Sequence, residues 1–105
     1  MSRSESLAEY LRAQGRWRLD RVEREDGGRN ARSALALLDA AAYADTLADD
    51  DPLVEGLAMA GCFGPAGFDD FDPGPRGLAL IRSWEAGEPW QLLLAVRNTL
   101  LGSLA

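Results

Sequence analysis

The chain contains very few β-branched residues, and this shortage limits its fold more than any other feature. Only six of the 105 residues are Val, Ile or Thr, at Val22, Thr46, Val54, Ile81, Val96 and Thr99. Strands draw heavily on such residues because a branched side chain packs well on a pleated surface. Leu and Ala, which both favour helix, occur 17 times each. We therefore predict an all-α fold, a compact bundle of five to six short helices with one long Gly/Pro/Phe-rich loop.

Charge is distributed unevenly along the chain. All 11 basic residues are Arg, and 17 acidic residues give a net charge of −6. Residues 1–32 carry eight Arg against six acids, whereas residues 33–105 carry three Arg against eleven acids. We treat residues 1–105 as a single helical domain, with an Arg-bearing N-terminal segment (1–30) and an acidic helical body (31–105). Because an acidic body repels nucleic acid, we expect no direct nucleic-acid binding.

The residue types that most often carry chemistry are scarce. The chain has no His, which is the commonest general base and the commonest metal ligand. Cys62 is the only cysteine, so an internal disulfide is impossible. It follows a predicted helix end, where the helix dipole disfavours a thiolate, and we expect an inert buried thiol. These observations favour a chain that has no metal, no cofactor and no catalytic residues.

No targeting or membrane segment is evident in the sequence. The first residues, Met1 to Glu5, lack the apolar run of a signal peptide. No apolar run approaches the ~20 residues that a membrane span needs. We therefore expect a cytoplasmic protein that does not bind a membrane.

The first part of the chain carries one clear helix and one ambiguous segment. Ser6 and Glu9 fit a capping box, which predicts a helix from about Ser6 to Gln14 that Gly15 ends. Residues 16–26 fit either a strand or a helix. We favour helix because the chain offers no second strand as a partner. Within this segment, Trp17 lies between two arginines. It could stack on a nucleic-acid base, make a surface cation–π contact or be a core tryptophan, and we favour the last two.

Four further helices follow from caps and periodicity. Residues 31–48 carry a wide arc of Ala and Leu, and the small alanines predict close packing against another helix. Asp51 followed by Pro52 is a strong start signal for a helix that reaches about Ala60. Gly74-Pro75 opens a helix through Ala86, and Glu88-Pro89 opens the last helix, to about Leu101.

The segment 61–77 combines five glycines, three prolines and all three phenylalanines, Phe63, Phe68 and Phe71. Two interpretations stay open, a lid over an apolar ligand or a loop held to the core by aromatic anchors. The aspartates at 69, 70 and 72 do not match a calcium loop, because the glycine and glutamate positions of that loop are absent. We expect Asp72 to cap the following turn.

Arg97 and Asp45 are charged residues on apolar helix faces. Arg97 lies in the middle of the apolar face of the last helix, and Asp45 lies in register with the alanines of 31–48. A buried guanidinium needs a carboxylate partner, so the two could pair. Alternatively, Arg97 and Arg76 could bind an anion beneath the 61–77 loop, or Arg97 could extend to solvent at a helix edge.

Three hypotheses about function follow from these features. The first is a non-catalytic binding or regulatory module that acts through protein–protein contacts. Leu92 and Val96 extend the apolar face of the last helix, which predicts a homodimer. The second is a binder of a small apolar or anionic ligand, or a small enzyme, with a pocket under the 61–77 loop. The third is an acidic mimic of nucleic acid that uses Asp49, Asp50 and Asp51.

Overall fold

Five helices form the regular structure of the part of the chain that the computed structural model describes, residues 2–64 and 70–102. These are α1 (Arg3–Leu19), α2 (Arg29–Asp45), α3 (Pro52–Met59), α4 (Gly74–Ser83) and α5 (Pro89–Gly102). Within those ranges no strand forms, and one isolated bridge joins Phe63 to Phe71. The predicted all-α fold is confirmed.

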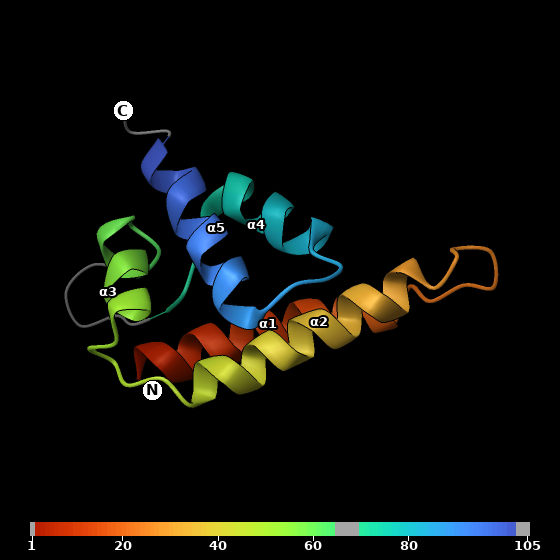
Figure 1. Cartoon of the computed structure of the whole chain (residues 1–105), viewed down its shortest axis with the longest axis horizontal. Coiled ribbons are helices and arrows are strands. Elements are labelled where there is room, and N and C mark those ends of the chain that lie inside the picture. Colours follow the sequence, from red (N-terminus) through yellow and green to blue (C-terminus); the bar gives the residue numbers. More distant parts are fainter. Residues whose placement is uncertain (1, 65–69, 103–105) are drawn as a thin grey trace.

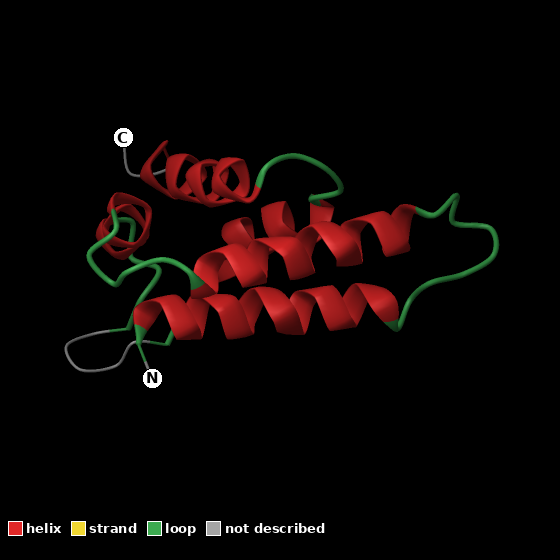
Figure 2. Cartoon of the chain, turned by 60° about the horizontal axis from the view of Figure 1, so that its bottom comes forward, coloured by secondary structure: helices red, strands yellow, loops and turns green. Residues whose placement is uncertain are grey.

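Helices α1 and α2 form a long antiparallel pair, and α3, α4 and α5 lie on one side of it (Figure 1). The connection between α1 and α2 extends beyond the rest of the molecule in both views (Figure 2). The α1–α2 contact is the most extensive between any two elements. The predicted close approach of the alanine face is confirmed, since Ala34, Ala40, Ala41 and Ala44 of α2 are all buried. This pair is the platform on which the other helices lie.

The start of α1 differs from the expected one. Helix α1 begins at Arg3, because the capping-box pattern Ser-x-x-Glu occurs twice, at Ser2–Glu5 and at Ser6–Glu9. The structure uses the first, in which the Ser2 Oγ accepts the backbone N–H of Glu5 at 3.1 Å. Asp49 then accepts hydrogen bonds from the backbone N–H of Ser4 and Arg3, both at 3.2 Å. These bonds, that from Ser4 foremost, hold the pKa of Asp49 below its ordinary value.

Gly15 does not end α1, which continues to Leu19. Instead it lies where α1 touches α2, and a Cβ there would come within 3.0 Å of the Leu38 side chain. The helical interpretation of residues 16–26 is therefore right as far as Leu19. Residues 20–28 form turns, because the Asp26 carboxylate accepts the backbone N–H groups of Glu23 and Gly28.

Helix α2 ends at Asp45, three residues earlier than predicted. The Thr46 hydroxyl donates to the Tyr43 carbonyl at 2.6 Å, and this bond replaces a helical partner at the C-terminus. The chain then turns and brings Asp49 over the start of α1. The predicted start of α3 is confirmed, with Pro52 at its first position and the Asp51 carboxylate accepting the Leu53 N–H.

Helix α4 ends at Ser83 rather than continuing to Ala86. Trp84 adopts an extended backbone conformation, and its carbonyl accepts the hydroxyl of the buried Ser33 on α2. The Trp84 ring then lies over Gly87, which has a φ of +123° and where a Cβ would be 2.7 Å from the ring. This tight connection turns the chain into α5, which begins at Pro89 as predicted.

The core lies between the α1–α2 pair and the other helices. Its buried residues are Leu7, Ala8, Leu11, Leu37, Ala40, Ala41, Ala44, Leu57, Cys62, Phe71, Ile81, Leu92, Leu93 and Val96. The monomer thus buries Leu92 and Val96 itself, so these two residues give no support to the predicted homodimer. Among the described residues, no helix is long and apolar enough to cross a membrane.

We predict that a larger side chain at Gly15 separates α1 from α2. Gly15→Leu is expected to lower the free energy of unfolding by about 2 kcal/mol, because the new atoms overlap Leu38. Ala13→Leu is the matched control, since Ala13 is an exposed residue of the same helix and its replacement should change stability by less than about 0.5 kcal/mol. Urea unfolding monitored by circular dichroism measures both. Equal losses in the two variants would contradict the close contact.

Candidate functional site

Two of the three phenylalanines of the predicted site, Phe63 and Phe71, form an aromatic cluster with Tyr10 of α1. The Phe71 ring lies 5.1 Å from that of Tyr10 and 5.5 Å from that of Phe63, in edge-to-face geometry. Phe71 is buried, and its backbone N–H donates to the Ser6 Oγ at 2.7 Å. Phe71 is therefore an anchor that holds its segment to α1. Phe68 lies outside the described residues.

Two contacts join residues 62–63 to residues 71–72. Phe63 and Phe71 form the isolated bridge, and the Asp72 N–H donates to the Cys62 carbonyl at 2.7 Å. The Asp72 carboxylate accepts the Gly74 N–H at 2.9 Å, so the predicted cap of this turn is confirmed. Of the predicted carboxylate group, Asp70 is exposed and Asp69 lies outside the described ranges.

Asp45 and Arg97 do not pair, contrary to the first of the three alternatives for them. The Asp45 carboxylate is exposed and accepts from Arg12 Nη2 of α1 at 2.7 Å. Arg97 donates to the side chain of its neighbour Asn98 and makes no ion pair within the described part of the chain. Both charges stay at the surface, where their desolvation cost is small.

The Arg97 side chain lies on α3 instead of entering the core. A Cβ at Gly56 of α3 would be 2.7 Å from the Arg97 Cδ, so the aliphatic part of the arginine covers the helix backbone there. Arg76 is exposed on the first turn of α4. The structure therefore brings Phe63 and Phe71 together, but it leaves Arg76, Arg97 and Asp45 on separate helices without a shared contact.

An open hollow of about 300 Å³ lies on the outer side of α1, lined by Glu9, Arg12, Ala13 and Arg16. All four residues belong to one helix, so no second element encloses the hollow. None of the predicted site residues lines it. The described residues also contain no cluster of three or more His, Cys, Asp or Glu that could hold a metal ion.

A second cluster surrounds Trp17, near the end of α1. The guanidinium carbon of Arg21 lies 3.7 Å from the centre of the Trp17 ring, and that of Arg82 from α4 lies 4.1 Å from it. Arg18 is more distant, at 5.6 Å. The predicted cation–π contact at Trp17 is thus confirmed, although the two nearest cations are not the sequence neighbours that suggested it. We call Arg21, Trp17 and Arg82 the arginine–tryptophan stack.

The aromatic cluster and the arginine–tryptophan stack lie along the same face of α1. Tyr10, Gln14, Trp17 and Arg21 follow one another at helical spacing. Arg82 bridges the two groups, because its Nε donates to the Gln14 Oε1 at 3.1 Å while its guanidinium lies over Trp17. The spacing on α1 is visible in the sequence. The contribution of Arg82 is not, because it depends on how α4 packs against α1.

Helix α5 presents a partly exposed apolar strip. Trp90, Leu94, Arg97 and Leu101 follow one another at spacings of four, three and four residues, which places them on one side of the helix. Trp90 is 44% exposed and Leu101 is 39% exposed. Leu92, Leu93 and Val96 of the same helix are buried. The predicted apolar face centred on Arg97 is therefore divided, because Leu93 packs in the core whereas Trp90 and Leu101 reach solvent. We call Trp90, Leu94, Arg97 and Leu101 the outer strip.

Burial is the largest cause of the pKa shifts of Cys62, which is buried, and of Tyr10, which is partly buried. It raises the pKa of the Cys62 thiol to about 11, and the negative charge of Asp72 acts in the same direction. The pKa of Tyr10 is raised by burial and by Asp72, while the positive charge of Arg82 opposes the change. The sequence-based expectation of a buried Cys62 is confirmed, because its side chain is fully inaccessible.

Comparison with known proteins yields no match to any family model, curated protein or solved structure.

We predict that Ser6 stabilises the fold through the Phe71 anchor. Ser6→Ala removes the acceptor of a buried backbone N–H, and the free energy of unfolding should fall by about 1–3 kcal/mol. Ser83→Ala, at an exposed serine of α4, should cost less than about 0.5 kcal/mol. Thermal unfolding followed by circular dichroism compares the two variants. A Ser6→Ala protein as stable as the parent would show that another group accepts this bond.

The Cys62 thiol should make the fold sensitive to alkaline pH. Since its pKa rises from 9.0 to about 11 on folding, the native state retains the proton longer, and stability should decrease as the pH rises from 9.0 toward 11. Tyr10 titrates nearby in the same direction, so Cys62→Ala is needed to isolate the thiol. We expect a flatter dependence of urea stability on pH in Cys62→Ala. Parallel curves for the two proteins would rule out the thiol as a cause.

Proposed function

We propose that this chain is a non-catalytic binding module that acts through protein–protein contacts, with the outer strip of α5 as its contact surface. The observation that carries the proposal is the exposure of Trp90 and Leu101 on a helix that is already anchored to the core through Leu92, Leu93 and Val96. Trp is strongly enriched among the residues that dominate binding energy at protein interfaces. A neighbouring guanidinium, Arg97, adds a group that interfaces also favour.

A small-molecule site receives less support from the same structure. Such a site would need Arg97 and the loop phenylalanines to line one pocket, whereas Arg97 lies on α3 and Phe71 packs against Tyr10. The open hollow on α1 contains neither. Binding of a small ligand would therefore require groups other than those that the sequence suggested.

Mimicry of nucleic acid is also weakly supported, because two of its three aspartates have structural roles. Asp49 caps the start of α1, and Asp51 caps the start of α3. Their carboxylates accept backbone N–H groups of their own chain, so of the three only Asp50 has no such capping bond among the described residues, although Asp49 is also exposed. A series of acids spaced like phosphates would need more groups directed at solvent.

Site-specific photo-crosslinking in cells that express the protein tests the proposed surface. A benzophenone amino acid in place of Trp90 should give a discrete covalent adduct on irradiation, because the outer strip is expected to be covered by a partner. The same probe in place of Leu35, which is 62% exposed on α2, is the matched control and should give no adduct. Adducts at both positions, or at neither, would contradict the proposal.

The mass of the adduct then identifies the partner. An adduct of twice the chain mass would support the homodimer, with the outer strip facing its own copy. A heavier or lighter adduct would support a different protein. Sedimentation of the parent and of Trp90→Ser/Leu101→Ser distinguishes these cases independently, since only a homodimer through this strip becomes a monomer on substitution. Both residues are partly exposed, so the double variant should remain folded.

A further inference from the structure

The arginine–tryptophan stack holds two guanidinium groups without a carboxylate. Arg21 and Arg82 both lie about 4 Å from the centre of the Trp17 ring, and neither forms an ion pair with any described residue. Acids are not scarce in this chain, which has 17 of them against 11 arginines. Three other arginines do pair with acids, namely Arg12, Arg29 and Arg32. Two like charges beside one ring repel each other, so an anion that bridges them would relieve that repulsion.

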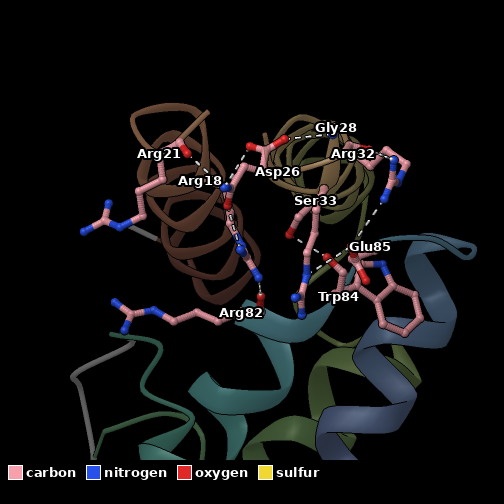
Figure 3. Close-up of polar contacts among 12 residues, drawn as sticks. Arg18, Arg21, Asp26, Gly28, Arg32, Ser33, Arg82, Trp84 and Glu85 are labelled. Carbon is pink, nitrogen blue, oxygen red and sulfur yellow. Dashed lines mark hydrogen bonds and ion pairs between the residues drawn. The ribbon is translucent and has the colours of Figure 1, made fainter. Parts of the chain in front are cut away.

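Arg18 supports the stack from behind but does not take part in it. Its Nη1 donates to the Asn30 Oδ1 at 2.7 Å, and its Nη2 donates to the Arg82 carbonyl. Figure 3 shows this side chain crossing from α1 to the end of α4, with Arg21 and Arg82 extending to the side away from α2. Arg18 thus joins the end of α4 to Asn30, while its buried Nε makes no hydrogen bond within the described residues.

The connection between α1 and α2 keeps Arg18 in this position. Asn30 donates to the Arg21 carbonyl and to the Asp26 carboxylate, and Asp26 also accepts two backbone N–H groups. These bonds, that from Glu23 foremost, hold the pKa of Asp26 below its ordinary value. The stack is therefore held by a fixed network, and little conformational freedom would be lost on binding.

Most of the donors of the two stacked arginines remain available. The Arg21 Nη1 donates to the Trp17 carbonyl, and the Arg82 Nε donates to the Gln14 side chain. The outward nitrogens of both can each receive a carboxylate in the forked geometry that arginine prefers. Two exposed apolar residues follow directly at this end of α1, Leu19 at 46% and Val22 at 49% exposure. The surface therefore combines paired cations with apolar area.

We infer that the arginine–tryptophan stack binds an acidic segment of a partner protein, in which two carboxylates reach Arg21 and Arg82. A short acidic segment fits better than nucleic acid, because carboxylates need only the two guanidinium groups, whereas a nucleic acid would also stack a base on Trp17. Two guanidinium groups already stack on Trp17, which leaves the ring less able to stack on a base. At physiological salt, charges beyond roughly 8 Å are screened, so the distant acids of the body do not oppose this contact.

This inference extends the proposed function to a second surface and specifies what it binds. The probe is a fluorescein-labelled octaglutamate peptide, titrated with the full chain and followed by fluorescence anisotropy. Octaglutamine is the uncharged counterpart. We expect octaglutamate to bind and octaglutamine not to bind, with weaker binding as salt increases. Arg21→Gln/Arg82→Gln should weaken octaglutamate binding by about tenfold or more.

Arg16→Gln/Arg24→Gln is the matched control, since it removes the same charge from two exposed arginines of the same segment that do not contact Trp17. It should change the Kd by less than about twofold. Should the stack variant fail to fold, Arg21→Gln alone carries the test. Arg21 is exposed, and its side chain donates only to the nearby Trp17 carbonyl among the described residues, so the single variant should remain folded. Trp90→Ser/Leu101→Ser should bind octaglutamate normally, so failure of the stack and failure of the outer strip are distinguishable.

Several results would overturn the inference. Equal binding of octaglutamate and octaglutamine would exclude recognition of carboxylates. Equal losses of octaglutamate affinity in the stack variant and the matched control would show that binding depends only on net charge. Binding of labelled oligodeoxythymidylate that depends on Arg21 and Arg82, without peptide binding, would assign the stack to nucleic acid. Self-association at low salt that the stack variant abolishes would assign it to a second copy of the chain.

Discussion

The close contact between α1 and α2 is the constraint on which the rest of the structure depends. Gly15 lets the helices approach until the Leu38 side chain fills the space of a missing Cβ, and the alanines of α2 complete the contact. Packing of this kind is intolerant of added volume. Because the two helices form a fixed platform, residues near opposite ends of α1 keep their places relative to α2. The aromatic cluster and the arginine–tryptophan stack both lie on that platform.

Distant segments are held to this platform by hydrogen bonds of single polar side chains. Ser6 accepts the Phe71 N–H, Asp49 caps the start of α1, and Ser33 donates to the Trp84 carbonyl. Each of these groups satisfies a backbone atom that a helix or a strand would otherwise satisfy. The connections can therefore be short and irregular without leaving these backbone atoms unpaired. The outer strip and the stack therefore lie on different helices, each supported by its own contacts.

The sequence predicts the helices well where a signal is local and unique. Asp51-Pro52 marks the start of α3 because no neighbouring position competes with it. Where two signals compete, local reasoning fails. Ser2–Glu5 and Ser6–Glu9 are equivalent as capping boxes, and only tertiary contacts place Ser6 inside the helix. Gly15 shows a similar ambiguity, since a glycine can end a helix or admit a neighbour.

The candidate sites were harder to predict because their members meet only in three dimensions. A helical wheel identified the face around Arg97, but α5 is apolar on both sides, and the wheel cannot say which side the core covers. The pairing of Asp45 with Arg97 failed because each charge reaches the surface on its own helix. Arg82 reaches Trp17 from α4, so the sequence around Trp17 alone could not predict that Arg82 belongs to the stack.

The contacts of α1 also imply an order of assembly. Its packing against α2 joins residues that are close in sequence, whereas Phe71 and Arg82 reach it from far along the chain. Local contacts close faster than distant ones, because shorter loops lose less entropy on closure. The α1–α2 hairpin should thus form before the C-terminal helices pack against it. During synthesis its apolar side stays uncovered until α5 has left the ribosome, which makes that interval the vulnerable stage of folding for this protein.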